Sequence, residues 1–236
     1  MICRIADLIV DIPASGSLAP RCTEYLCDDM TSTDVIIRTE LYNGEKYPKN
    51  MTEEMVEYME SGWQFYFQLL RQNGIYLHSS AIAYQGKAFL FSGNPGAGKS
   101  THTRLWQSVF GEEACVFNDD KPALRFLDGT WYAYGTPWCG KDGINRNMKV
   151  PVAGICFMKQ AQENKIRRLS PLEAAQRIIA QTMSKFKMEE SLDLMLGYVN
   201  NLVKTIPVFE LENRPEPEAA MMSYETMRRA AEEMGL

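Results

Sequence analysis

Residues 93–101 read Gly93-Asn94-Pro95-Gly96-Ala97-Gly98-Lys99-Ser100-Thr101. This run satisfies the phosphate-binding pattern G-x-x-x-x-G-K-[ST], in which glycines let consecutive backbone N–H groups turn toward a phosphate. The lysine supplies a positive charge to the outer phosphates, and the hydroxyl that follows it reaches Mg²⁺. The pattern therefore indicates a site for a nucleoside triphosphate.

The segments on either side of this run fit the same kind of site. Lys87 to Phe91 is a short apolar run that predicts a buried strand, and Thr101 to Phe110 predicts a helix. A strand, a glycine-rich loop and a helix N-terminus together present free N–H groups and the positive end of the helix dipole to an anion. An ordinary glycine-rich turn is the alternative, but it does not require this order of elements.

Composition limits the classes of protein to consider. The chain has 236 residues, 45% of them hydrophobic, and a net charge of −5, values typical of a globular protein with a sizeable core. There is no basic stripe for nucleic acid, no apolar stretch long enough for a membrane span and no secretory signal pattern. The six cysteines form no C-x-x-C pair. We therefore expect a cytoplasmic protein with free thiols and neither a membrane nor a nucleic-acid partner.

Hydrophobic patterning in the N-terminal part predicts two strands and a helix. The strands are expected over Ile5–Ile12 and Thr33–Leu41, and the helix over Thr52–Gln72, ended by Gly74. An aromatic stripe at helical spacing is usually core. We therefore assign to the core Met55, Tyr58, Met59, Phe65, Tyr66, Leu69 and Leu70.

The remaining patterns predict hairpins and then helices. The hairpins are Leu77–Tyr84 with Lys87–Phe91 around Gln85-Gly86, and Ala123–Leu127 with Thr130–Tyr134 around Asp128-Gly129. Other strands are expected over Ala114–Asp119, Val152–Lys159 and Val208–Leu211. Helices are expected from the capping box Ser170-Pro171-Leu172-Glu173 to about Phe186, over Glu189–Val203 and over Pro217–Met234.

These elements predict an α/β fold with a mixed sheet, because hairpins join the strands as often as helices do. We expect one compact domain over residues 1–236. Its parts are N-terminal strands and a helix over 1–74, a nucleotide-binding core over 75–160 and a mainly helical part over 161–236.

Two adjacent carboxylates, Asp119 and Asp120, follow the apolar run from Cys115 to Phe117. At a strand end one element after the phosphate loop, one carboxylate can hold Mg²⁺, directly or through water, while the other accepts a proton from an attacking hydroxyl or water. Neighbouring like charges push their titrations apart, which suits acid–base chemistry. A solvated turn is the alternative, since Asp-Asp before Lys121-Pro122 is favourable turn chemistry.

Histidine supplies one further candidate. His78 lies on a small-residue strand whose hairpin partner leads into the glycine-rich run, where it could orient a phosphate or tune a carboxylate. A structural histidine is the alternative. We interpret His102, in the following helix, as structural or exposed.

The loop from Gly135 to Gly143 contains three glycines and can lie over a substrate. Lys141, Asp142 and Arg146 are the groups in or near it that could contact phosphates or an acceptor. An ordinary connection rich in turn residues is the alternative.

Together these motifs resemble the HPr kinase/phosphorylase catalytic domain and related small serine kinases of the phosphoenolpyruvate-carboxykinase-like fold. The matching segments are Leu77-His78-Ser79-Ser80-Ala81, the phosphate loop from Phe91 to Thr101, and Phe117-Asn118-Asp119-Asp120. The likeness to the bifunctional enzyme covers about residues 75–160, and the whole chain is similar to stand-alone kinase-like members in bacterial peptide-modification clusters. The fold this implies is a P-loop kinase with a mixed sheet and a helical C-terminal part.

The resemblance implies a role for each matching position. Asp119 would be the general base, with Lys99 and His78 as the other catalytic groups, and Ser100 and Asp120 would serve Mg²⁺. ATP would be held by Gly93, Asn94, Pro95, Gly96, Ala97, Gly98, Lys99, Ser100 and Thr101.

One part of the pattern differs from the bifunctional enzyme. That enzyme has a Glu and an Arg around Gly-Leu-Gly, where this chain reads Gly135-Thr136-Pro137-Trp138-Cys139-Gly140. The metal-assisting glutamate is missing from the expected place, and no segment suits docking of HPr. The resemblance therefore leaves open whether this chain has phosphorylase activity.

We expect an ATP- and Mg²⁺-dependent kinase whose acceptor is a hydroxyl, a serine in a peptide, a protein or a free amino acid. One alternative is an ATPase or switch that passes the phosphate to water. Another is a catalytically degenerate nucleotide-binding scaffold in a maturation complex. By analogy with the resembled family, a homo-oligomer is also expected.

Overall fold

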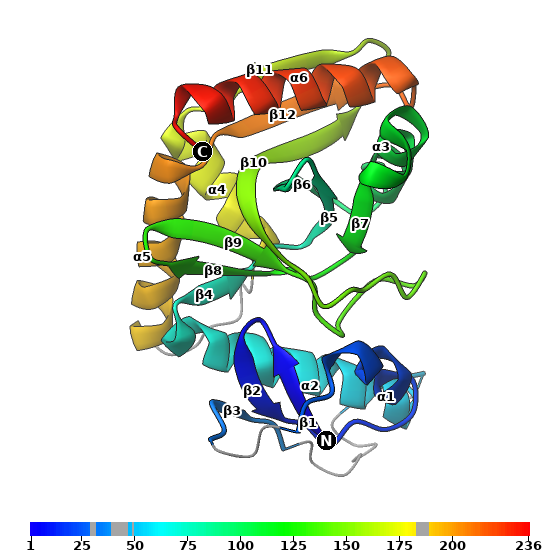
Figure 1. Cartoon of the computed structure of the whole chain (residues 1–236), viewed down its shortest axis with the longest axis vertical. Helices are drawn as coiled ribbons and strands as arrows, with labels where there is room; N and C mark the ends of the chain where they lie inside the picture. Colours follow the sequence, from blue (N-terminus) through cyan, green and yellow to red (C-terminus); the bar gives the residue numbers. More distant parts are fainter. Residues whose placement is uncertain (29–31, 39–46, 49, 183–188) are drawn as a thin grey trace.

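The computed structural model describes residues 1–28, 32–38, 47–48, 50–182 and 189–236 (Figure 1). Within these ranges a three-stranded sheet near the N-terminus is followed by a larger, nine-stranded sheet. None of the helices in the described ranges has the length and hydrophobicity needed to cross a bilayer. All six cysteines are free, as predicted, and four of them are buried.

The small sheet begins with a hairpin that the sequence patterning missed. The single strand predicted over Ile5–Ile12 is wrong, because β1 (Ile2–Ile5) and β2 (Leu8–Asp11) are separate antiparallel strands. Ala6 and Asp7 form the turn, with φ angles of 53° and 60°. Two positive φ angles are typical of a two-residue hairpin turn, but alanine is not a usual signal for one.

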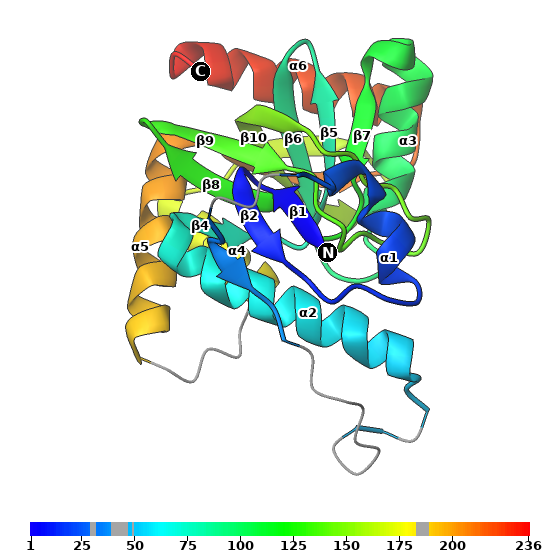
Figure 2. The ribbon, with the colours of Figure 1, turned by 60° about the horizontal axis from the view of Figure 1, so that its bottom comes forward.

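The strand predicted over Thr33–Leu41 is confirmed only at β3 (Val35–Ile36), which pairs in parallel with β2. Residues 39–41 lie outside the described residues. A short helix, α1 (Leu18–Arg21), precedes β3 and was not predicted. Figure 2 brings this part of the chain forward, with α2 (Glu53–Leu69) beside the small sheet.

The long helix α2 (Glu53–Leu69) confirms the predicted N-terminal helix, with Thr52 as its cap. A short 3₁₀ turn follows, and the left-handed residue that ends it is Asn73 rather than the predicted Gly74, which begins β4 (Gly74–Tyr76). The predicted core face is corrected at two positions. Met55 and Met59 are 50% and 49% exposed, because they face a cavity rather than another element.

The larger sheet is centred on β10 (Lys149–Gln160). This strand pairs in parallel with β6 (Lys87–Ser92) and β12 (Val208–Asn213), and antiparallel with β9 (Thr130–Tyr134). The predicted mixed sheet is therefore confirmed. The other strands are β5 (Ser79–Tyr84), β7 (Cys115–Asn118), β8 (Ala123–Leu127) and β11 (Lys165–Arg168). The edge strand β11 was not predicted, because its sequence is mostly charged.

Both predicted hairpins are confirmed. Gln85 and Gly86 join β5 to β6, and Asp128 and Gly129 join β8 to β9; all four residues have positive φ. This is the turn whose twist matches that of the strands it connects.

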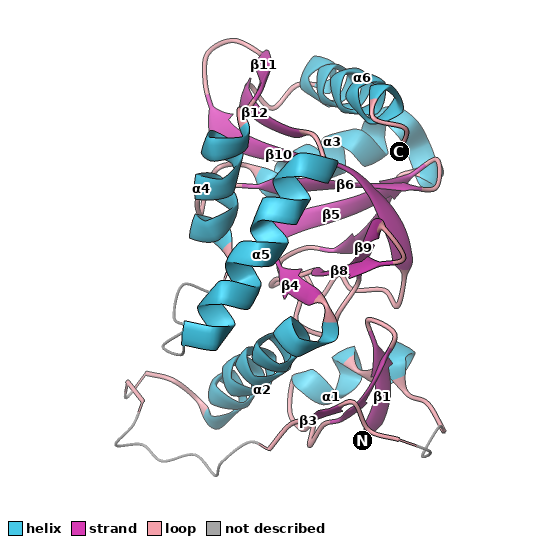
Figure 3. Ribbon diagram, turned by 90° about the vertical axis from the view of Figure 1, so that its left-hand side faces the viewer, coloured by secondary structure: helices cyan, strands magenta, loops and turns pink. Residues whose placement is uncertain are grey.

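Helices cover both faces of this sheet, as Figure 3 shows. Alternation along β6 explains the layers: Ala88 and Leu90 pack in the core with α4 (Pro171–Gln181) and α5 (Glu189–Thr205). Phe89 and Phe91 pack on the opposite side with α3 (Lys99–Phe110) and α6 (Pro217–Glu233). The predicted capping box at the start of α4 is present. The helix ends at Gln181, where Thr182 takes an extended backbone conformation, so it is shorter than predicted; residues 183–186 of the prediction lie outside the described residues.

Candidate active site

The glycine-rich run forms the connection between β6 and α3. Gly93, Gly96 and Gly98 have φ angles of 144°, 81° and 96°, a region that side chains with a Cβ rarely adopt. The helix begins at Lys99, directly after Gly98. The predicted order of strand, loop and helix is therefore found, while binding of a phosphate stays a prediction.

Lys99 folds back over this loop. Its Nζ donates to the carbonyl oxygen of Gly93 at 3.0 Å. Burial lowers the pKa of Lys99, and the charges of Asp120 and Asp119 act in the opposite direction. The ammonium group is thus partly withdrawn from water and lies within the field of both carboxylates.

A cavity of about 650 Å³ lies between the loop and α2. Five predicted catalytic or metal-binding residues line it: His78, Lys99, Ser100, Asp119 and Asp120. From the 135–143 loop, Lys141 and Asp142 also line it, whereas Arg146 does not.

The other predicted nucleotide-binding positions lie elsewhere on the loop. Gly93 and Asn94 border a second cavity, of about 510 Å³, together with Gln181. Of the predicted nucleotide-binding positions, five line neither of these cavities: Pro95, Gly96, Ala97, Gly98 and Thr101.

Asp120 is held by two cationic or hydrogen-bonding partners. Its Oδ1 lies 3.1 Å from His78 Nε2, and its Oδ2 forms an ion pair with Lys121. Burial would raise the pKa of Asp120, but the hydrogen bond from His78 and the charge of Lys121 outweigh it and the pKa is lowered. Asp120 is therefore a fixed, ionised carboxylate whose two oxygens both have partners.

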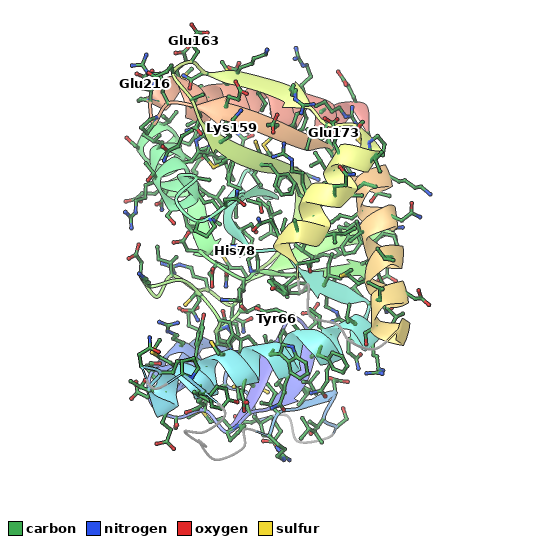
Figure 4. The ribbon with its side chains drawn as sticks, turned by 180° about the vertical axis from the view of Figure 1, so that it is seen from behind. Tyr66, His78, Lys159, Glu163, Glu173 and Glu216 are labelled. Carbon is green, nitrogen blue, oxygen red and sulfur yellow. The ribbon has the colours of Figure 1, made fainter. Side chains whose placement is uncertain are left out.

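His78 is positioned from α4. Its backbone N–H donates to the carbonyl oxygen of Gln181 at 2.8 Å, and its Nδ1 lies 3.0 Å from Gln181 Oε1. Figure 4 labels His78, which lies on the side of the larger sheet, and Tyr66, which lies on α2. The sequence offered no signal for Gln181, because a lone amide at a helix end has no motif.

Asp119 differs from its neighbour in having an oxygen without a partner. Its Oδ1 is buried and accepts no hydrogen bond within the described residues. A buried carboxylate oxygen in this state is costly unless a ligand or water satisfies it. Gly140 packs against the same residue, since a Cβ built there would lie 2.9 Å from the Asp119 carbonyl oxygen.

The 135–143 loop is anchored to its surroundings. Trp138 is fully buried, and its Nε1 donates to Ser61 Oγ at 3.0 Å. The carbonyl oxygen of Cys139 accepts from Tyr58 Oη at 2.8 Å and from an Arg21 guanidinium N–H at 3.1 Å. The loop therefore forms a fixed wall of the cavity.

The wall of the cavity that comes from the α1 and α2 region was not predicted. It consists of Ser17, Arg21, Glu54, Met55, Tyr58 and Met59. Helical periodicity identified the apolar face of α2, but periodicity does not show whether that face meets another element or an open cavity.

His102 lies outside the cavity, in the core between α3 and α6. It is fully buried, its Nε2 lies 3.0 Å from Ser223 Oγ, and burial lowers its pKa to about 4. The structural interpretation is therefore confirmed and the exposed alternative is wrong.

The fold and the cavity define a mixed α/β protein in which a glycine-rich strand-to-helix loop faces a pair of carboxylates. The chain belongs to the ScmC family, since the family model described as SynChlorMet cassette protein ScmC matches residues 45–214. Among solved structures it is similar to the Hpr(Ser) kinase/phosphatase from Coxiella burnetii. The identity is 10% and the TM-score 0.38, over 68% of this chain and 92% of that chain.

The search of curated proteins gave no match. The family model carries a different name from the family that the sequence resembles, so the HPr kinase resemblance stays a prediction.

Proposed function

We propose that this chain is an ATP- and Mg²⁺-dependent kinase that transfers the γ-phosphoryl group to a hydroxyl, a serine in a peptide, a protein or a free amino acid. One observation carries the proposal. Lys99 and Ser100, from the glycine-rich loop, line the same cavity as His78, Asp119 and Asp120. Phosphate-binding groups and a carboxylate pair are the parts that phosphoryl transfer requires.

The residues of the cavity fit a magnesium nucleotide. Lys99 would exchange the carbonyl oxygen of Gly93 for the outer phosphates, and the N–H groups at the start of α3 would face the same anion. Ser100 would bind Mg²⁺ directly. Asp120 would bind it through water, because its oxygens already face His78 and Lys121. When bound, Mg²⁺ neutralises charge on the phosphates.

Asp119 is the group suited to accept the proton. Asp119 lines the cavity, and its buried Oδ1 has no hydrogen-bond partner among the described residues. As the acceptor oxygen bonds to the γ-phosphorus and the bond to the β-phosphate oxygen breaks, the hydroxyl proton passes to Asp119 and ADP leaves. His78 positions Asp120 and does not need to take part in the proton transfer.

The test uses purified protein, Mg-ATP labelled in the γ-phosphate, free serine and a set of serine-containing peptides. We expect labelled phosphoserine that forms only with Mg²⁺. Labelled inorganic phosphate released at the same rate with and without acceptors would instead support an ATPase. Tight ATP binding without any turnover would support a scaffold.

A further inference from the structure

A third, smaller cavity lies beside the 650 Å³ cavity that contains the proposed active-site residues. Its volume is about 170 Å³, and aromatic side chains form most of its walls: Trp63, Tyr66, Tyr76 and Trp138. We call this cavity the aromatic recess. Tyr58 and Met59 line both the recess and the larger cavity, so the two cavities adjoin.

The recess is built into the packing of α2 against the 135–143 loop. The ring of Trp138 stacks on Phe65 with 4.7 Å between centroids, and its Nε1 donates to Ser61. At Gly62, a Cβ would lie 2.9 Å from Trp138 Cδ1. The glycine lets the helix approach the indole closely, and the hollow beside it is therefore preformed.

The volume of the recess and the charge of its lining residues favour an uncharged, apolar group as its occupant. An apolar cavity of about 150 Å³ is large enough to bind benzene, so the recess can take one ring or one aliphatic side chain. Lys121 is the one charged side chain among its lining residues, and Asp120 already neutralises it. The aromatic walls favour stacked or edge-to-face contacts with a ring.

The apolar surface continues along α2 outside the recess. Met55, Met59 and Trp63 follow one another at four-residue intervals on one helix face, and they are 50%, 49% and 47% exposed. Contiguous exposed apolar side chains of this kind mark an interaction site. Because Met55 lines the larger cavity and Trp63 lines the recess, this surface connects the two.

We propose that the phosphoryl acceptor is a peptide segment that places an aromatic or aliphatic side chain in the aromatic recess while its hydroxyl lies near Asp119. This inference rests on the proposed kinase function and selects one of its acceptor classes. A free hydroxy amino acid has no group to fill the recess. A peptide can reach both cavities, since neighbouring residues of an extended chain are spaced about 3.3 Å apart.

The test compares short peptides with one serine and one phenylalanine placed one to four residues away, each matched by an alanine version. At the best spacing, phenylalanine should raise kcat/KM on the order of 10-fold, the effect of burying one ring. Trp63→Ala should remove most of this preference. Met221→Ala, which truncates a similarly exposed side chain on α6, should retain it. Equal rates for phenylalanine and alanine peptides at every spacing, or free serine as the best acceptor, would overturn the proposal.

Binding of the same peptides, measured by calorimetry with ADP and Mg²⁺, separates this inference from the kinase function. If no peptide is phosphorylated but phenylalanine peptides bind more tightly than alanine peptides, and Trp63→Ala removes the difference, the recess claim holds and the kinase function fails. If Trp63→Ala weakens ATP binding instead of peptide binding, the recess holds the nucleotide base and the proposal is wrong.

Discussion

His78 Nε2 lies 3.1 Å from Oδ1 of Asp120, while Nδ1 of the same ring lies 3.0 Å from Oε1 of Gln181. The imidazole thus connects the last residue of α4 to the carboxylate pair that follows β7. Lys121 holds the other oxygen of Asp120, whereas Asp119 Oδ1 has no partner in the part of the chain that the structure describes. We infer that the two neighbouring carboxylates have different tasks.

Removing the imidazole should disturb the placement of Asp120. We expect His78→Ala to lower the rate of phosphoryl transfer about 10–100-fold, the usual effect of losing a group that orients a metal-serving carboxylate. His78→Gln, whose amide can still donate to Asp120, should recover part of the rate. The measurement is kcat at saturating ATP over a range of Mg²⁺ concentrations. A wild-type rate and Mg²⁺ dependence in His78→Ala would exclude the positioning role.

Gly140 should tolerate no side chain. A Cβ there would lie 2.9 Å from the carbonyl oxygen of Asp119 and 3.6 Å from its Oδ2, so Gly140→Ala must shift the carboxylate or the loop. Displacement of a reacting group by about 1 Å can cost on the order of 100-fold in rate. Gly197→Ala is the matched control, because among the described residues no atom outside its own helical turn lies within 4 Å of a Cβ at that position. Equal kcat values for the two variants would contradict this packing argument.

Lys99 should contribute to nucleotide affinity. Loss of a charge-assisted hydrogen bond to phosphate predicts that Lys99→Ala binds ATP at least about 10-fold more weakly. Calorimetric titration with Mg-ATP gives the affinity. Lys165→Ala, an exposed lysine on β11, is the control for loss of charge. Unchanged affinity in Lys99→Ala would show that the glycine-rich loop does not bind the triphosphate in the proposed way.

Stability should depend on pH through His102. Burial lowers its pKa from 6.5 to about 4, so the unfolded chain takes up this proton first as the pH falls. The stabilising contribution is complete above pH 6.5 and is lost between pH 6.5 and 4. By linkage, the free energy of unfolding should drop by about 2 kcal/mol between pH 7.5 and 5.

Urea unfolding at several pH values measures this dependence. His102→Gln, whose amide can still contact Ser223, should flatten the curve between pH 7.5 and 5. The same slope in the variant and the wild type would assign the pH dependence to other groups.

The sequence predicted those parts of the fold that local chemistry determines. Asp128-Gly129 specified its hairpin correctly because both residues accept positive φ. The hairpin at Ala6 and Asp7 was missed because its first residue is not a usual turn former. The helix α4 ends at Gln181, earlier than predicted, because Thr182 adopts an extended conformation that the helical pattern does not reveal.

Sequence motifs likewise predicted some of the residues that line the cavity, but not all of them. Lys99, Asp119 and His78 were found from their spacing along the chain. Gln181 and the exposed face at Met59 were missed, because their positions depend on which elements fold against one another. The domain division, the cytoplasmic location and the homo-oligomer stay predictions.

The most direct test of the account is the rate of phosphoryl transfer in Asp119→Asn. The control is Asp128→Asn, which removes the same charge in a turn where asparagine also accepts positive φ. With Mg-ATP and the best peptide acceptor, we predict that Asp119→Asn lowers kcat about 10²–10⁴-fold while ATP binds with nearly wild-type affinity, and that Asp128→Asn retains the wild-type kcat. Full phosphoryl transfer by Asp119→Asn would contradict the assignment of Asp119 as the base and, with it, the proposed mechanism.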